Sequence, residues 1–254
     1  MPVTVANSVF CAPLLLPGPA LNVTQNLAIF DLDHTLLAGD SDHLWGEFLI
    51  EQGLVDAAGY RQANDRFYAE YQAGTLDIQD FAAFAFAPLV KYGRAQLAPL
   101  RSQFVEQVIA PLVAASAPAL LERHRSAGDL LLITTATNHF VTEPIAELLG
   151  VEHLIATDPE ETAEGFTGRI AGQPNFQGGK IKRLLAWLEA QQISPGHSSC
   201  YSDSINDLPL LEWADQPCAV DPDPRLRATA LQRGWPVISL RQAPAAELAV
   251  ASRP

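Results

Sequence analysis

The chain has few of the residues that indicate a disulfide-rich, thiolate-metal or nucleic-acid-binding protein. It has three cysteines in 254 residues, and none is spaced as C-x-x-C with another. This argues against a disulfide framework or a thiolate zinc site and fits a reducing compartment. Basic residues are also scarce, because 16 lysines and arginines face 29 aspartates and glutamates, for a net charge of −13. Nonspecific nucleic-acid binding needs a basic face, so we expect no nucleic-acid partner.

The N-terminal segment lacks the features of a signal peptide or a membrane anchor. Its apolar run, residues 11–16, is far shorter than the about 20 residues that a transmembrane helix needs. No lysine or arginine precedes this run. Because prolines interrupt the segment and no periodicity is present, we predict that residues 1–26 form a loosely ordered extension. We therefore expect a cytoplasmic protein with no membrane partner.

Short apolar runs that end in polar or small residues are typical of buried parallel strands. Such runs occupy residues 27–30, 130–134, 199–201 and 218–220, and helical patterns at 118–126, 180–191 and 206–213 precede the last three. Strands that alternate with helices predict an α/β fold with a doubly wound parallel sheet. Ligands of such sheets bind beyond the carboxyl ends of the strands, so we expect the functional site there.

About a hundred residues separate the first two predicted strands, whereas a crossover usually needs about a dozen. We interpret residues 42–116 as a helical cap inserted after the first strand, and residues 27–41 with 117–254 as the α/β core. The predicted helix starts are Ser41 or Asp42, and Thr75, and the predicted helix ends are Gly53, Gly74 and Gly93. Further on, residues 166–170 are predicted to be one arm of a small β-hairpin.

Two aspartates directly follow the first predicted strand. Asp31 and Asp33 point the same way on an extended chain, because alternate side chains share a face. Two carboxylates this close repel, so one keeps a proton or a cation lies between them. A calcium loop does not fit, because position six is Leu36 rather than glycine and position twelve is Asp42 rather than glutamate. The pair therefore predicts a metal site, a nucleophile, or an acid paired with a base.

Three later segments bring further polar groups to predicted strand ends. The second strand ends in hydroxyls at 134–137, Lys180 follows two glycines at a helix start, and Asp203 and Asp207 follow the third strand. Each has an ordinary alternative, namely a strand-to-helix cap, a solvated lysine, and a surface or helix-capping acid. In this order, and all at strand ends, they indicate a common site.

This set of motifs resembles the haloacid dehalogenase-like superfamily from Leu27 to about Ser239, and is most similar to its phosphoserine-phosphatase-like branch. The resemblance implies a phosphatase that acts on a small phosphomonoester through an aspartyl-phosphate. Asp31 would be the nucleophile and Asp33 the general acid and base. Thr135 and Lys180 would bind the phosphoryl oxygens. Thr135 is preferred over Thr134, which still fits the strand.

The resemblance also implies a Mg²⁺ cofactor and a set of substrate-binding residues. Mg²⁺ would be bound by the Asp31 side chain, the Asp33 backbone carbonyl and Asp203. Asp207 would hold the metal's waters or join its ligands. The implied substrate-binding residues are Asp40, Thr135, Ala136, Asn206 and Lys180.

The motifs depart from the branch at positions that bear on the substrate. Where phosphoserine phosphatases have a glutamate that binds the substrate amine, nine residues after the nucleophile, this chain has Asp40. That leaves a phosphoserine-like or a histidinol-phosphate-like substrate open, and a helix-capping role for Asp40 is an equal alternative. Serines replace the usual glycines on both sides of Asp203. Basic residues of the insert that could bind a substrate anion are Arg61, Arg66, Lys91, Arg94 and Arg101.

The motifs do not separate a hydrolase from a phosphotransferase or mutase on the same scaffold. A non-catalytic protein that binds a phosphorylated ligand is a further alternative, although the intact charge cluster argues against it. A receiver-like protein is disfavoured, because the long insert would cover the phosphorylation site.

Overall fold

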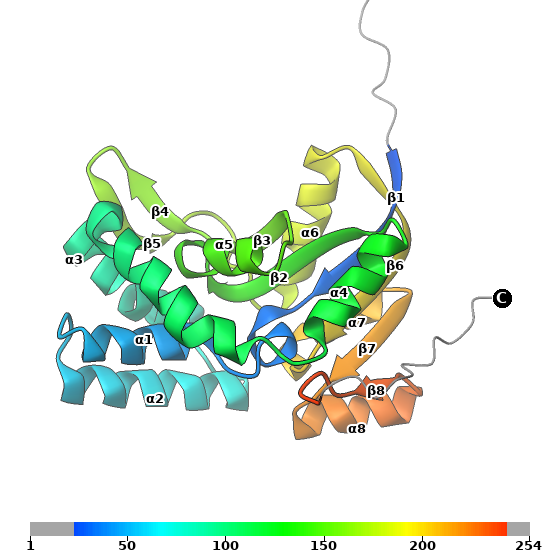
Figure 1. Ribbon diagram of the computed structural model, residues 1–254, viewed down its shortest axis with the longest axis horizontal. Coiled ribbons are helices and arrows are strands. Elements are labelled where there is room, and N and C mark those ends of the chain that lie inside the picture. The colour runs from blue at the N-terminus through cyan, green and yellow to red at the C-terminus, as the bar shows by residue number, and fades with distance from the viewer. Residues whose placement is uncertain (1–22, 243–254) are drawn as a thin grey trace, which may run out of the picture.

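A six-stranded parallel sheet forms the centre of the structure, a computed structural model that describes residues 23–242 (Figure 1). Across the sheet the strands are β3 (His153–Thr157), β2 (Leu130–Asn138), β1 (Val23–Phe30), β6 (Ile193–Ser202), β7 (Gln216–Val220) and β8 (Val237–Ile238). Every neighbouring pair is parallel. The predicted α/β fold with a doubly wound parallel sheet is confirmed.

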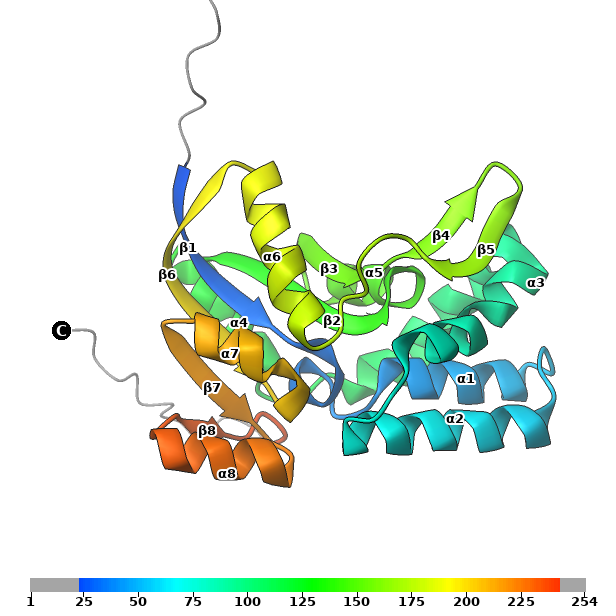
Figure 2. The ribbon, with the colours of Figure 1, turned by 180° about the vertical axis from the view of Figure 1, so that it is seen from behind.

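Helices cover both faces of the sheet, which buries its central strands. One face carries α4 (Ala117–Ser126) and α5 (His139–Leu148), and the other carries α6 (Gly178–Ala190), α7 (Leu208–Trp213) and α8 (Pro224–Arg233) (Figures 1 and 2). In β1, Ala28 and Phe30 pack against the first layer, while Leu27 and Ile29 pack against the second. Burial on both faces is why this strand is a continuous apolar run in the sequence.

The insert after β1 is helical, as the sequence predicts. It contains α1 (Ser41–Glu51), α2 (Ala57–Ala73) and α3 (Ile78–Phe104), followed by short helical turns at Val105–Ile109 and Ala110–Leu112. Gly74 ends α2 in the left-handed conformation, with φ of 74°. The break predicted at Gly93 is a kink inside α3, where φ is 71° and ψ is 167°.

Both predicted starts of insert helices are wrong by one or two residues. Asp40, not Ser41 or Asp42, caps α1, and Asp77, not Thr75, caps α3. In each case the carboxylate accepts hydrogen bonds from the backbone N–H groups of the second and third residues that follow it. This is the usual satisfaction of free amides at a helix start.

The insert shares a hydrophobic core with the sheet. Trp45 and Phe48 of α1 belong to the same buried cluster as Phe30 of β1, and the Trp45 ring lies edge-on to Phe104 at 5.2 Å. The division of the chain into an α/β core and a cap at 42–116 stays a prediction. No helix within residues 23–242 has the length and apolar character needed to cross a bilayer.

Several predicted boundaries shift in the structure. β1 begins at Val23, so residues 23–26 of the predicted extension are part of the first strand, and residues 1–22 lie outside the described residues. The predicted hairpin arm is β5 (Gly165–Ile170), which pairs antiparallel with β4 (Pro159–Thr162). The hairpin lies against α3, where Arg94 forms an ion pair with Glu161 at 2.9 Å. The edge strands β3 and β8 were not predicted.

Candidate active site

Asp31 stands at the point where β1 ends, at the centre of the sheet. Its backbone N–H donates to the carbonyl of Tyr201 on the neighbouring strand β6 at 2.9 Å, which fixes its place between two strands. The next residues form a tight turn, Leu32–Leu36, in which Asp33 is extended and His34 is left-handed with φ of 56°. Asp31 and Asp33 both line one cavity, as expected for alternate residues.

Lys180 is the cation of the site and is almost completely buried. Its Nζ lies 2.7 Å from Asp31 Oδ1 and 2.7 Å from Asp207 Oδ2, and all three side chains are at most 5% exposed. Burial alone would lower the pKa of Lys180, but the charges of Asp207 and Asp31 outweigh it and raise that pKa. A Cβ on Gly179 would come within 2.2 Å of the Pro174 carbonyl oxygen, so the start of α6 needs glycine there.

Asp203 completes a group that we call the strand-end cluster, which consists of Asp31, Lys180, Asp203 and Asp207. Thr35, the last residue of the motif at 31–35, to which the sequence assigns no role, bridges two of its acids. The Thr35 hydroxyl lies 3.2 Å from Asp203 Oδ1 and 3.4 Å from Asp31 Oδ2, and it accepts the Asp203 N–H at 3.0 Å. Burial, and then the charges of Asp31 and Asp207, raise the pKa of Asp203 well above its ordinary value.

The strand-end cluster has the charge and the free oxygen that a divalent cation requires. Three carboxylates face one ammonium, which leaves two negative charges when all are ionised. Asp207 Oδ1 is buried without a hydrogen-bond partner. In residues 23–242, no three or more His, Cys, Asp or Glu side chains are arranged to hold a metal by themselves. Carboxylate oxygens completed by backbone carbonyls and waters are the ligands that Mg²⁺ prefers in proteins.

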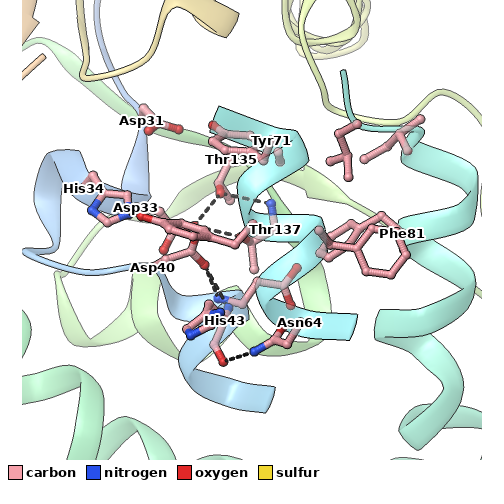
Figure 3. Close-up of a pocket in the computed structure, with 16 residues that line it drawn as sticks. Asp31, Asp33, His34, Asp40, His43, Asn64, Tyr71, Phe81, Thr135 and Thr137 are labelled. Carbon is pink, nitrogen blue, oxygen red and sulfur yellow. Dashed lines mark hydrogen bonds between the residues drawn. The ribbon is translucent and has the colours of Figure 1, made fainter. Parts of the chain in front are cut away.

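Asp33 lies apart from Lys180 and is held by hydroxyl and backbone donors. Its Oδ1 accepts the Ser41 N–H at 2.6 Å, and its Oδ2 accepts the Thr137 hydroxyl at 2.7 Å and the Thr135 hydroxyl at 3.4 Å (Figure 3). Burial, and then the charge of Asp40, raise the pKa of Asp33, although these hydrogen bonds oppose the rise. The two carboxyl groups of the motif thus lie in different environments, and Asp33 is the one suited to carry a proton.

The threonine hydroxyls at the end of β2 have two different hydrogen-bond partners. Thr135 and Thr137 turn toward Asp33, whereas the Thr134 hydroxyl accepts the Asn175 amide at 2.9 Å. The preference for Thr135 over Thr134 as a phosphate ligand stays a prediction, and both residues belong to strand β2. The sequence did not assign Thr137 to the site. Its two-residue spacing from Thr135 was the available signal.

A cavity of about 610 Å³, including its open mouth, lies between these strand ends and the insert helices (Figure 3). Its acidic members are Asp31, Asp33, Asp40 and Asp42, and its aromatic members are Phe67, Tyr68, Tyr71 and Phe81. His34, His43 and Ala136 also line it, but no lysine or arginine of residues 23–242 does. Asp40 and Asp42, which we call the cavity acids, therefore have no lysine or arginine beside them in the cavity wall.

Two predicted substrate-binding residues have structural contacts instead. Asp40 lines the cavity, but its Oδ1 caps α1 by accepting the N–H groups of Asp42 and His43 at 3.0 and 2.9 Å. Asn206 does not line the cavity, and its Nδ2 donates to the Tyr71 carbonyl at the end of α2, at 3.2 Å. Substrate binding by either residue stays a prediction.

The basic residues of the insert do not line the cavity, although the Arg66 guanidinium lies 4.3 Å from the centre of the Phe67 ring, which does. Arg61 pairs with Glu47 at 3.0 Å, and Arg101 pairs with Glu143 at 3.2 Å and also donates to the Phe140 carbonyl. Arg66 lies 3.7 Å from Glu70, and the Lys91 ammonium lies over the ring of Tyr92. Together with Arg94, which pairs with Glu161, these residues do not line the cavity as substrate ligands would.

Comparisons with known proteins agree on one family. The model of the haloacid dehalogenase-like hydrolases matches residues 28–212. A histidinol-phosphatase of Neisseria meningitidis is 43% identical over 222 residues, which are 85% of this chain and 100% of the relative. The phosphoserine phosphatase SerB1 of Mycobacterium tuberculosis is 29% identical over 226 residues, which are 88% of this chain and 73% of the relative.

Solved structures show the same fold. A Bordetella pertussis protein of unknown function is 44% identical and superposes with a TM-score of 0.81, over 86% of this chain and 100% of that one. A phosphoserine phosphatase with an analogue of its phospho-aspartyl intermediate has a TM-score of 0.61 at 15% identity, over 87% of this chain and 95% of that one. The second likeness concerns the fold alone. The resemblance that the motifs predicted is confirmed, and this chain belongs to the haloacid dehalogenase-like hydrolase family, as one of its phosphatases.

Proposed function

We propose that this protein is a Mg²⁺-dependent phosphomonoesterase that forms an aspartyl-phosphate and acts on a small phosphorylated amino alcohol of the histidinol phosphate type. The observation that carries the proposal is the cavity. Asp31 of the buried Asp31–Lys180 pair lines it, and no lysine or arginine of residues 23–242 does. The substrate is a small molecule, and a cytoplasmic location stays a prediction.

Asp31 and Asp33 divide the chemistry between them. The Asp31 carboxylate attacks phosphorus, and the bond from phosphorus to the substrate oxygen breaks. Asp33 gives its proton to the leaving alkoxide, which is why a raised pKa and firm positioning by Thr137 matter. Asp33, now ionised, then takes a proton from water. That water attacks phosphorus, the bond to Asp31 breaks, and inorganic phosphate is released.

Lys180 and the remaining acids support this sequence electrostatically. Lys180 holds Asp31 in place and compensates the charge that develops on the phosphoryl oxygens, together with the Thr135 hydroxyl. Asp31, Asp203 and the Asp33 carbonyl would hold Mg²⁺, and Asp207 would orient its waters through the free Oδ1. Bound Mg²⁺ supplies the positive charge that lets a carboxylate approach a phosphate dianion.

The cavity lining discriminates between the two candidate substrate types. Phosphoserine carries a carboxylate, which would enter a cavity with four acids and no lysine or arginine in its wall. Burying a charge without a partner is costly, so this placement is unfavourable. Histidinol phosphate has an ammonium and an imidazole but no carboxylate, and both fit acidic and aromatic walls. The 43% identity with a histidinol-phosphatase supports the same choice.

The test is phosphate release from histidinol phosphate and from phosphoserine, with and without Mg²⁺. We expect kcat/KM to be at least about tenfold higher for histidinol phosphate, since one unfavourable charge contact of about 1.4 kcal/mol corresponds to that factor. A chelator should stop turnover, and Asp31→Asn should release no phosphate from either substrate.

Each part of the proposal can fail separately. A preference for phosphoserine would overturn the substrate assignment, and activity that is indifferent to chelation would overturn the metal. Full activity of Asp31→Asn would remove the covalent mechanism. Circular dichroism of that variant serves as the control for its fold.

A further inference from the structure

Asp42 is an acid of the cavity for which the proposed chemistry has no use. It lies in the first turn of α1 and lines the main cavity. It also lines a second, smaller cavity of about 190 Å³, which shares Phe81 and Ala136 with the main one and continues to Phe86. Asp42 therefore stands at the junction of the two spaces, beside an aromatic wall.

The Asp42 carboxylate is poorly compensated by the protein itself. Its Oδ1 has a weak contact with the Asn138 amide, at 3.4 Å. Burial, and then the charges of Asp40 and Asp33, raise its pKa well above the ordinary value, and no cation among residues 23–242 opposes this rise. A carboxylate in such surroundings gains free energy when a cation is supplied from outside.

Asp40 differs from Asp42 although the two are neighbours in the cavity. One oxygen of Asp40 already accepts two backbone N–H groups and so fixes the start of α1. The same helix start donates the Ser41 N–H to Asp33. Loss of the Asp40 carboxylate would therefore disturb the general acid, whatever the substrate carries.

On the basis of the proposed function, we propose that Asp42 is the specificity residue for the cationic group of the substrate, and that Asp40 is a positioning residue for α1. Asp42 accepts a hydrogen bond from a protonated nitrogen of the organic group. The face of Phe81 lies on the same wall and stabilises that cation.

The experiment measures the ratio of kcat/KM for histidinol phosphate to kcat/KM for glycerol 3-phosphate, whose organic part is neutral. In Asp42→Asn we expect this ratio to fall by about 10-fold to 100-fold, the effect of losing one hydrogen bond to a charged group. The loss should lie mainly in KM. Asp42→Glu should retain part of the ratio, because it keeps the charge.

Matched variants separate specificity from general damage. Asp65→Asn removes one charge from an exposed position on α2 that does not line the cavity, and it should leave the ratio unchanged. Asp40→Ala, which removes the helix cap, should lower kcat/KM for both substrates together. An unchanged ratio in Asp42→Asn, or a fall confined to Asp40→Ala, would overturn the inference.

A binding measurement keeps the inference independent of turnover. If the wild-type protein does not hydrolyse histidinol phosphate, the proposed function fails. Calorimetric binding of unphosphorylated histidinol to wild type and to Asp42→Asn then decides the role of Asp42. Binding that weakens at least about tenfold in the variant would support it, and equal binding would refute it.

Discussion

The strand-end cluster and the cavity acids are two concentrations of negative charge that the protein treats differently. In the cluster, Lys180 contacts both Asp31 and Asp207 at 2.7 Å, and hydroxyls of Thr35 and Ser202 bind the same acids. The cavity acids have no lysine or arginine beside them in the cavity wall. Asp40 receives backbone amides, and Asp42 receives one weak amide contact.

The difference indicates which negative charges the protein compensates with its own residues and which it leaves uncompensated. Buried acids that the chain must keep ionised to perform chemistry carry their own counter-charge. An acid that is left without one creates an unfavourable potential, which an incoming cation relieves. On the proposed function, a metal would complete the strand-end cluster, and a cationic substrate would be complementary to the cavity acids.

Replacing Lys180 should have the largest effect, because it removes the counter-charge that distinguishes the strand-end cluster from the cavity acids. In Lys180→Met, the acids Asp31 and Asp207 lose their cation, and we expect about 10³-fold lower kcat because a donor to the phosphoryl group is also lost. Breaking a buried pair should also reduce the free energy of unfolding by about 3–5 kcal/mol, measured by urea denaturation.

Two further variants test this interpretation of Lys180. Lys182→Met, at an exposed position of the same helix, should change neither quantity. The double variant Lys180→Met/Asp207→Asn should recover part of the stability. Equal stability of the single and double variants would show that charge imbalance is not the cause.

Replacing Asp33 should have the second-largest effect. Asp33 stands between the strand-end cluster and the cavity acids, and its proposed role requires a proton. We expect Asp33→Asn to lower kcat by about 10²-fold or more on an alkyl phosphate, whose alkoxide needs an acid. With 4-nitrophenyl phosphate the loss should be smaller, because that leaving group departs without a proton. The measurement is the ratio of the two losses, and equal losses would contradict the role of Asp33 as general acid.

The smallest expected effect is on stability, because the poorly compensated Asp42 carboxylate lowers the free energy of unfolding. Because its folded-state pKa is raised, the folded protein binds this proton more tightly than the unfolded chain. The stability of the wild type therefore falls as pH rises above 3.8, the ordinary aspartate value, through the higher folded-state pKa. In Asp42→Asn this loss is absent, so the variant should melt about 2–4 °C higher than wild type at pH 8.

Calorimetry at several pH values measures this difference. The gap between Asp42→Asn and wild type should shrink as pH is lowered toward 4. Asp65→Asn, which removes an exposed acid, should show no such trend. A gap that is the same at every pH would mean that the Asp42 charge is already compensated in the folded protein.

The fold was predictable because its main signals are local. Strands β1, β2, β6 and β7 are apolar on both faces, so their runs are visible in the sequence. β8 has two residues, too few to show any period, and so it was not predicted. The insert helices were recognised from their spacing. Their starts were misplaced because several polar residues that could cap a helix occur together at 40–42 and 75–77.

The acids of the site could be predicted from the sequence, whereas most of the side chains that hydrogen-bond to them could not. Asp31 and Asp33 follow a strand directly, and alternation alone places them on one side. Thr35 could not be assigned a partner, because Asp203 lies 168 positions away in the sequence. Ser202 lies five positions from its partner Asp207, and Thr137 had a signal in its spacing from Thr135. Asn206 was assigned to the substrate, which stays a prediction, and in the structure its Nδ2 donates to the Tyr71 carbonyl of α2.

The sequence by itself determined the α/β sheet and the acids at its strand ends, because buried strands and their final residues are contiguous in the chain. Tertiary structure alone decided how the charges are balanced. Lys180 meets Asp31 across 149 positions of sequence, and three arginines of the insert, Arg61, Arg94 and Arg101, pair with acids that do not line the cavity. Charge compensation depends on distance in space and on burial, and neither quantity is encoded in local spacing.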